Sequence, residues 1–534
     1  MKHVLCLTHK EVLLSRALLL ILLGSVFLNA FLLLNTFHGD PSIYLIYARN
    51  IAQTDFFSFN PGEFSSGSTS PLWAVILSLA FFFPHSVYIA KLLSLLFTLV
   101  AILLTYMMSL KLSGSKTSSA VATFALLPFL AFPGLMLYES SLIICLVNLL
   151  IWFLHDILDN QISFSPRRIM FIGLVWAAIP LCRPDASIMV ALSIATLVIA
   201  LREEREHLLM LTLTLILALT PSFLYFGYSH VSLGTFSTSS LCRTLAFWEG
   251  SQDKSLRILG VALSTNPSRF FVAFPIIFWS GFAVWGWQSK YWKNESMPAR
   301  WFLILAPLAH IVLLSIALPD CTPKEIERYI LPVIPFLVSL SAIGLARLFG
   351  PSISRRRILC LAVLCLPFLC WSVQRATKES LKQRKRGLSF DVITERAVVE
   401  HLNEIAEPSA TLLAYEVQTR YYLRSDLRLL SLDGITDGKV APHLSKGDIS
   451  SFLWKHKPNY WLANDAVFYR SYLAKGILNA AVIKTGDREG ASVIIDDITF
   501  TNMRKRKEPS LKHFADYRQL YRLTYDSVAR ERKP

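Results

Sequence analysis

Long apolar runs dominate the pattern of hydrophobic and polar positions along the chain. They include Val12–Leu34, Val87–Leu110, Leu208–Tyr228 and Tyr329–Leu348. Each has roughly the ~20 residues that an α-helix needs to cross a hydrocarbon core of about 30 Å. A large soluble helical core is excluded, because helices of this kind would expose apolar surface on every side. The pattern therefore predicts a multi-pass membrane protein, with the first run retained as an anchor because it lacks a signal-peptide cleavage pattern.

One apolar run, Pro71–Phe83, is too short to cross easily. If it lies along the interface instead, the basic loops between spans all fall on one side, as the positive-inside rule requires. These loops contain Lys2 and Lys10, Lys111 and Lys116, Arg167 and Arg168, Arg202 and Arg205, Lys290, Lys293 and Arg300, and Arg355–Arg357. The sequence then predicts about eleven transmembrane helices, a cytoplasmic N-terminus and an outward-facing C-terminal part.

The pattern changes after about Gln374, where apolar runs shorten to four to six residues and turn signals such as Asp433-Gly434 appear. The predicted fold is an all-α polytopic membrane domain followed by a small soluble α/β domain. We place the membrane domain at residues 1–374, with its first outside loop at 35–85, and the soluble domain at 375–534.

Composition changes this picture little. The hydrophobic share of 53% fits membrane spans. The net charge of +16 sits mainly in loops and the last third, which suits orientation and anionic headgroups, and no nucleic-acid-binding motif accompanies it. The eight cysteines lack zinc-site spacing, and most lie in or beside apolar spans. A disulfide between Cys242 and Cys321 is one option.

Polar residues stand out at the predicted outer ends of spans. Asp40 follows the first span directly, where a carboxylate serves as a general base, as a metal ligand, or as the N-cap of a helix that begins at Pro41. Arg183 and Asp185 join two short apolar runs, so they are either recessed functional residues or a pair that closes the hairpin.

Two further positions have alternative readings. Glu139 either belongs to a site or is a helix-start residue favoured by the helix dipole. Arg328-Tyr329 either belongs to the same site or anchors a span at the interface. In the predicted topology all of these positions share the outer face, and this convergence favours a site there.

The first loop resembles that of the GT-C superfamily of glycosyltransferases, and most closely the mycobacterial terminal arabinofuranosyltransferase branch and its bacterial relatives. The resemblance is carried by Asp40-x-x-Ile43, Tyr47-Ala48-Arg49-Asn50, Phe59-Asn60-Pro61-Gly62-Glu63 and Thr69-Ser70-Pro71-Leu72-Trp73. Shorter pieces follow in order: Tyr138-Glu139-Ser140, Cys182-Arg183-Pro184-Asp185, Phe226-Gly227, Arg328-Tyr329-x-x-Pro332 and Leu432-Asp433-Gly434. The sequence departs from the family pattern at Gly39, where the family has a first aspartate, and at Leu233-Gly234-Thr235, where it has Pro-Asn-Thr.

The resemblance implies transfer of a sugar, with a pentofuranose as one candidate, from a polyprenyl-phosphate donor to a cell-envelope glycan or glycolipid at the outer face of a bacterial inner (plasma) membrane. It implies Asp40 as the catalytic residue. The implied substrate-binding residues are Arg49, Asn60, Glu63, Glu139, Arg183, Asp185, Arg328 and Tyr329. Arginines suit the donor phosphate because their planar fork matches its oxygens. No cofactor is certain, and a divalent cation is an open alternative. The expected partners are the donor, the acceptor and membrane lipids, without nucleic acid.

Other functions compete with this reading. A lipid-linked oligosaccharide ligase or polymerase also uses outside loops with arginines, although its large loop is expected late in the membrane region. A flippase-type transporter predicts inverted repeats and helices broken at the midplane, which the sequence lacks. An inactive scaffold is the last alternative, because Gly39 replaces one aspartate of the family's pair.

Overall fold

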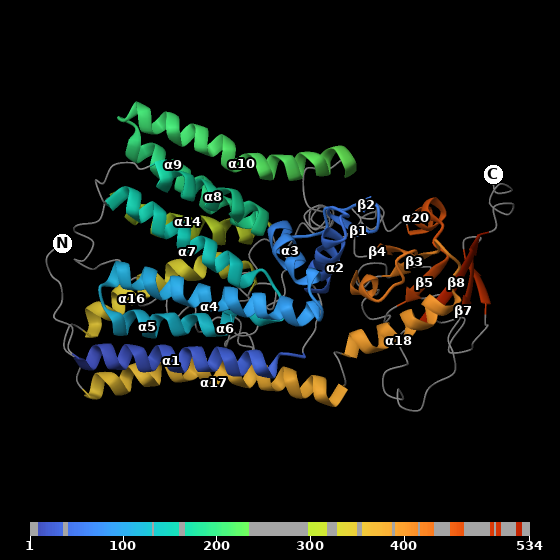
Figure 1. Cartoon of the computed structure of the whole chain (residues 1–534), viewed down its shortest axis with the longest axis horizontal. Coiled ribbons are helices and arrows are strands. Elements are labelled where there is room, and N and C mark those ends of the chain that lie inside the picture. Colours follow the sequence, from blue (N-terminus) through green and yellow to red (C-terminus); the bar gives the residue numbers. More distant parts are fainter. Residues whose placement is uncertain are drawn as a thin grey trace.

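The computed structural model describes residues 9–35, 41–130, 133–159, 166–233, 283, 297–317, 328–349, 355–386, 390–414, 417–431, 449–463, 492–495, 498–502 and 519–525. Within these residues a bundle of long helices forms one end of the molecule and a mixed sheet forms the other (Figure 1). Short elements of the first loop lie between the two, as Figure 1 shows.

The bundle contains helices of very different length, because several apolar segments are interrupted by proline or by 3-10 turns. Its α-helices are α1 (His9–Leu32), α4 (Ser86–Ser113), α5 (Lys116–Thr123), α6 (Leu127–Leu130), α7 (Ser140–Asp159), α8 (Pro166–Cys182), α9 (Ser187–Leu201), α10 (Arg205–Leu233), α14 (Met297–Ala317), α16 (Ile334–Phe349) and α17 (Arg355–Arg386). Its 3-10 turns are η2 (Phe124–Leu126), η3 (Gly134–Met136), η4 (Pro184–Ala186) and η6 (Leu331–Val333).

The four apolar runs named above are helical over most of their length, and the predicted polytopic helical domain is confirmed. In the described part of the chain, seven helical stretches are long and apolar enough to cross a membrane. Large apolar side chains such as Leu20, Leu217 and Val231 are exposed on the bundle, as expected of surfaces that face lipid. The predicted total of about eleven spans includes segments outside the described residues and stays a prediction.

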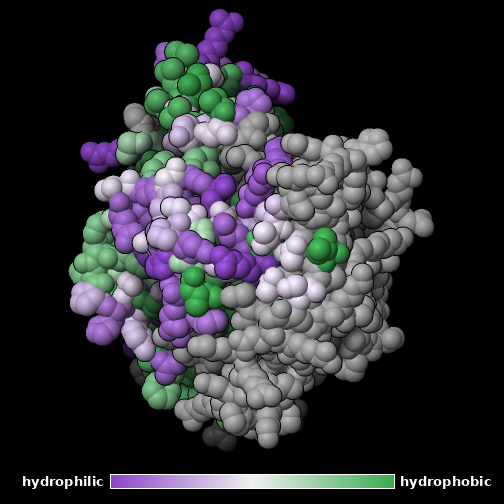
Figure 2. All heavy atoms as spheres, turned by 90° about the vertical axis from the view of Figure 1, so that its right-hand side faces the viewer, coloured by the Kyte–Doolittle hydropathy of each residue, from purple (hydrophilic) through white to green (hydrophobic). Residues whose placement is uncertain are grey.

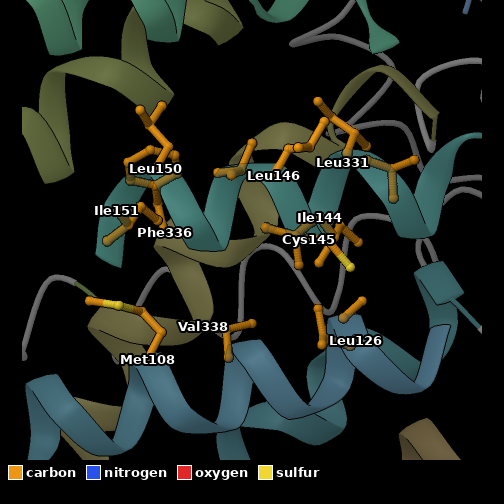
Figure 3. Packing of buried hydrophobic residues seen from close by; sticks show 14 of the residues in the cluster. Met108, Leu126, Ile144, Cys145, Leu146, Leu150, Ile151, Leu331, Phe336 and Val338 are labelled. Carbon is orange, nitrogen blue, oxygen red and sulfur yellow. The ribbon is translucent and has the colours of Figure 1, made fainter. Parts of the chain in front are cut away.

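The interior of the bundle is close-packed and apolar. Ile144 and Cys145 of α7 lie above Leu126, and Ile151 of the same helix lies above Met108 of α4, all in one buried cluster (Figure 3). Buried hydroxyl and amide groups also join the helices: Thr98 bonds to Ser141 at 2.7 Å. Such interhelical hydrogen bonds are the expected way to satisfy polar side chains inside a membrane bundle.

The C-terminal part is a six-stranded sheet in the order β4-β3-β5-β8-β7-β6. The strands are β3 (Thr411–Ala414), β4 (Arg428–Ser431), β5 (Tyr460–Ala463), β6 (Ser492–Ile495), β7 (Ile498–Asn502) and β8 (Gln519–Tyr525). Strand β3 is parallel to β4 and β5, and the other pairs are antiparallel. Three helical elements accompany the sheet, namely α18 (Phe390–Ile405), η7 (Val417–Tyr421) and α20 (Ile449–His456). This arrangement confirms the predicted α/β character.

Helix α17 extends past the predicted end of the membrane domain. It continues through residue 374 to Arg386, so the predicted domain boundary falls inside a helix.

Cys242 and Cys321, the pair considered for a disulfide, lie outside the described residues. Among the described cysteines, Cys145, Cys182, Cys360, Cys365 and Cys370 are free.

The first loop folds into α2 (Pro41–Ala52), a hairpin of β1 (Ser58–Asn60) and β2 (Glu63–Phe64), α3 (Pro71–Ser78) and the 3-10 turn η1 (Leu79–Phe82). Gly62 makes the hairpin turn with φ +77°, a conformation that glycine adopts without steric cost, and its N–H donates to Asp55 Oδ2 at 2.8 Å. The short run that we expected at the interface is thus α3 and η1, located where the bundle meets the sheet (Figure 1).

The sheet end of the molecule differs in polarity from the bundle. Figure 2 shows this end face-on, with hydrophilic residues over much of its described surface and hydrophobic residues mainly towards the top and the left edge. A hydrophilic end next to an apolar bundle is the polarity expected of a domain that projects from a membrane into water.

Candidate functional site

Three bundle segments end at the same place, beneath the first loop. Glu139 directly precedes α7, Arg183 directly follows α8, and Arg328 lies three residues before η6. Side chains from segments far apart in the sequence therefore meet at the end of the bundle that faces the sheet.

Glu139 is the centre of this cluster. It is 2% exposed, and its carboxylate accepts hydrogen bonds from three side chains. Arg183 Nη1 donates to Oε1 at 3.0 Å, Arg328 Nη2 donates to the same oxygen at 3.4 Å, and the Tyr44 hydroxyl donates to Oε2 at 2.8 Å. A carboxylate so deeply buried is tolerated only when it is paired and hydrogen-bonded.

Arg183 is held on all sides. It is 4% exposed, and its Nε and Nη2 donate to the two carboxylate oxygens of Asp185 at 3.1 and 3.2 Å. Its Nη1 also donates to the backbone carbonyl of Arg328 at 3.0 Å, and its guanidinium lies 4.8 Å from the ring centre of Tyr329. These contacts use the planar fork of arginine fully, so this side chain is fixed in one position.

Arg328 is less constrained. Its side chain is 21% exposed, and its contact with Glu139 is the longer of the two arginine contacts. Its guanidinium lies over the ring of Tyr138 at 4.5 Å, a cation–π arrangement that favours this position. Arg328 is therefore the more exposed of the two arginines in the cluster.

Electrostatics keeps the cluster ionised. Burial raises the pKa of Glu139, but Arg328 and Arg183 outweigh burial, so the net effect is a lowered pKa. Burial acts to lower the pKa of Arg183, but Asp185 and Glu139 outweigh it and the pKa is raised. For Tyr44, burial and then the Glu139 carboxylate raise the pKa well above its ordinary value, so the phenol keeps its proton and donates it to Glu139.

Sequence reasoning missed several residues of this cluster. Tyr44 lies on α2 and bonds to both Glu139 and Thr69, the latter at 2.7 Å. His310 lies inside the apolar helix α14, and its Nε2 donates to the Tyr329 carbonyl at 2.9 Å and lies 3.7 Å from Asp185 Oδ2. Neither residue is conspicuous in the sequence, because Tyr44 lies in a loop segment and His310 within an apolar run. Their contacts form only when separate helices pack together.

The other predicted binding residues lie elsewhere, at the contact between the first loop and the C-terminal domain. The Asn60 side-chain amide donates to the Leu429 carbonyl and accepts from the Leu429 N–H, both at 2.9 Å, so it pairs with the edge strand β4. Glu63 pairs with Arg428 Nε at 2.7 Å. Arg49 donates to the Tyr421 carbonyl at 3.3 Å and lies over the Tyr421 ring. The structure therefore joins Glu139, Arg183, Asp185, Arg328 and Tyr329, and places these three residues apart from them.

Asp40, the predicted catalytic residue, lies outside the described residues. Helix α2 begins at the next residue, Pro41, and brings Tyr44 into the cluster. The described part of the chain has no group of three histidine, cysteine, aspartate or glutamate side chains that could hold a metal ion. A divalent cation stays a prediction, and Glu139 and Asp185 already bond to Arg183.

Four features define the class of fold. The helical bundle is long enough to cross a membrane, and a long first loop folds over its end. A buried ionic cluster lies beneath that loop, and an α/β domain follows at the C-terminal end. This is the polytopic helical membrane fold with a C-terminal α/β domain that the sequence predicts.

Comparison with solved structures confirms this fold. ArnT from Cupriavidus metallidurans bound to undecaprenyl phosphate superposes with a TM-score of 0.58 at 13% identity, covering 96% of this chain and 99% of that chain. The same protein in its apo state gives a TM-score of 0.56 at 13% identity, over 94% and 97% of the two chains. Arabinofuranosyltransferase AftD from mycobacteria gives 0.50 at 13% identity, over 95% of this chain and 41% of that chain. No family profile and no curated protein matches the sequence.

Proposed function

We propose that this protein is a membrane glycosyltransferase. It moves a sugar, with a pentofuranose as the candidate, from a polyprenyl-phosphate donor to a cell-envelope glycan or glycolipid at the outer face of a bacterial plasma membrane. The observation that carries the proposal is the buried cluster of Glu139, Arg183 and Arg328 beneath the first loop. Its support is the shared fold with a protein that was solved with undecaprenyl phosphate.

The two arginines have different roles in this proposal. Arg183 is saturated by Asp185, Glu139 and a backbone carbonyl, so it holds the cluster together. Arg328 is more exposed than Arg183 and its contact with Glu139 is the longer one, so in this proposal Arg328 binds the donor phosphate through charge-assisted hydrogen bonds. A polyprenyl tail needs lipid beside the phosphate site, and the cluster lies at the end of an apolar bundle.

The proposed reaction is a transfer of the sugar from the donor to the acceptor. An acceptor hydroxyl oxygen forms a bond to the anomeric carbon of the sugar, and the bond between that carbon and the phosphate oxygen breaks. Negative charge develops on the departing polyprenyl phosphate, where the Arg328 guanidinium stabilises it. The hydroxyl proton passes to a base, for which Asp40 is the candidate from the sequence.

Binding of undecaprenyl phosphate to the purified protein tests this proposal. Arg328→Gln is expected to weaken binding by roughly 10- to 100-fold, the range for losing a hydrogen bond to a charged group. Arg522→Gln is the matched control, because Arg522 also pairs with a carboxylate, Glu407, but on the C-terminal sheet. Equal affinity in the parent and Arg328→Gln, or no binding by the parent, contradicts the proposal. Release of polyprenyl phosphate from a polyprenyl-phosphate pentofuranose then tests the transfer itself.

A further inference from the structure

The turn that leads into Glu139 has an unusual backbone. Leu137 is 1% exposed and has φ +68° and ψ 20°, in the left-handed region that non-glycine residues rarely adopt. Holding a leucine there costs on the order of 1–3 kcal/mol, and such a conformation persists only where the surroundings determine it. Something in the structure must therefore hold this turn.

Trp73 of α3 is the side chain that holds it. Its indole N–H donates to the Leu137 carbonyl at 2.8 Å, and the residue is 0% exposed. The ring packs edge-on against Phe97 of α4, with centroids 5.5 Å apart, so the direction of the N–H is fixed. The bond matters because Leu137 lies before α7, outside the regular hydrogen-bond ladder of a helix.

Helices α4 and α7 fix the other end of the same turn. The Ser94 hydroxyl donates to the Gly134 carbonyl. A Cβ at Gly134 would lie 2.5 Å from Ser141 Oγ and 2.9 Å from Thr98 Oγ1, so a larger residue there would displace these two hydroxyl groups. The turn from Pro133 to Tyr138 is thus attached to α3, α4 and α7.

The position of this turn sets the position of the ionic cluster. Tyr138, whose ring lies under the Arg328 guanidinium, and Glu139 are the next two residues after Leu137. The Glu139 carbonyl accepts a hydrogen bond from Ile143 N–H, so the Glu139 backbone is fixed to the first turn of α7. A change in the Leu137 peptide therefore moves both groups that hold Arg328.

We propose that Trp73 is a positioning residue of the donor-phosphate site: by pinning the Leu137 carbonyl it sets Tyr138 and Glu139 so that Arg328 faces the phosphate. This inference rests on the proposed function, because it takes the phosphate as the ligand of Arg328. It also gives a physical role to the tryptophan of the Thr69–Trp73 segment, a role that the sequence motif does not reveal.

The test compares two tryptophans that are equally buried. Trp73→Phe keeps an aromatic ring against Phe97 and removes the N–H donor. Trp176→Phe is the control, because Trp176 is also 0% exposed and its N–H also makes one 2.8 Å bond, to Ser193 Oγ on α9. Binding of undecaprenyl phosphate to Trp73→Phe is expected to weaken roughly five- to tenfold, the effect of one buried hydrogen bond, and Trp176→Phe is expected to bind like the parent.

A double-mutant cycle separates positioning from a general loss of structure. If Trp73 acts through Glu139, then Trp73→Phe has little further effect on binding in a Glu139→Gln background, so the two changes are not additive. Leu137→Gly gives a second background, because glycine adopts φ +68° without the steric cost that a Cβ brings, so the turn no longer depends on the hydrogen bond from Trp73. Binding by Trp73→Phe/Leu137→Gly is expected to equal that of Leu137→Gly, and this pair carries the test if Trp73→Phe alone does not fold.

The outcomes distinguish the two proposals. Equal loss of binding in Trp73→Phe and Trp176→Phe, or full additivity with Glu139→Gln, overturns the role of Trp73 while the parent still binds the lipid phosphate. Absence of binding by the parent overturns the proposed function instead.

Discussion

Replacement of Arg183 by methionine is the sharpest test of how the cluster is held together. Methionine keeps much of the aliphatic volume of arginine but removes the shorter arginine contact of Glu139, while the longer Arg328 contact and the Tyr44 hydrogen bond remain. Asp185 also loses its two hydrogen bonds to the guanidinium. The substitution thus removes one partner from a buried ion pair without opening a large cavity.

The expected cost at neutral pH is about 3 kcal/mol of unfolding free energy, the lower end of the range for breaking a buried pair, because Arg328 still neighbours Glu139. The cost depends on pH. In the parent the pKa of Glu139 is lowered, so its contribution is present above the ordinary carboxyl pKa and is lost as pH falls through the lowered value. In Arg183→Met the burial effect dominates and raises that pKa, so the variant recovers stability as pH falls. The difference in unfolding free energy between the parent and Arg183→Met is therefore expected to become smaller towards about pH 4.

Denaturant titration in a mild detergent from pH 4 to pH 8 measures this gap. Lys111→Met is the matched control, because Lys111 pairs with Asp156 where both side chains are about one-fifth exposed, so a smaller loss is expected. A gap of under 1 kcal/mol at pH 7, or one that stays constant with pH, would refute the assignment of Arg183 as the residue that keeps Glu139 ionised.

Two further predictions concern the parts of the chain that lead to and from the cluster. Asp40→Asn keeps the size and most of the capping ability of the residue, and it is expected to lower turnover roughly 10²- to 10⁴-fold with nearly unchanged thermal stability, as measured by product formation and a melting curve. Retention of most activity would place the base elsewhere. A reporter that is active only in the cytoplasm, fused after Arg386 at the end of α17, is expected to stay silent, and a strong signal would overturn the predicted orientation.

Much of the membrane fold was predictable because its signal is local. A run of apolar residues long enough to cross hydrocarbon has few other stable states, so Val87–Leu110 is recognisable before any contact is known. The hairpin around Arg183 was equally predictable, since Pro184 separates two short apolar runs, and the structure ends α8 at Cys182 and begins α9 at Ser187. The alternation of short apolar runs with turns likewise indicated the α/β domain.

The composition of the ionic cluster was only partly predictable. Glu139, Arg183 and Arg328 were conspicuous because charged groups at the ends of apolar runs are costly. Tyr44 and His310 were not, because a tyrosine in a loop helix and a histidine within an apolar helix acquire a role only through their partners. Asn60 had a strong motif signal, yet its amide pairs with the backbone of Leu429, which is 369 positions away along the chain. No local pattern encodes a contact of that separation.

The charges of the cluster set how the donor must enter. Arg183 and Arg328 are balanced by Glu139 and Asp185, so the resting cluster has no excess positive charge to attract a phosphate. A phosphate competes best for the more exposed cation, and the 3.4 Å contact of Arg328 with Glu139 is the longer of the two arginine contacts to that carboxylate. Under the proposed function, the donor phosphate replaces Glu139 as the partner of Arg328. Arg183 meanwhile keeps Glu139 paired and avoids the cost of an uncompensated buried charge. In the proposed reaction the leaving polyprenyl phosphate carries more negative charge than the sugar ester. The contact with Arg328 would then strengthen as the reaction proceeds, which is the condition for catalysis rather than binding alone.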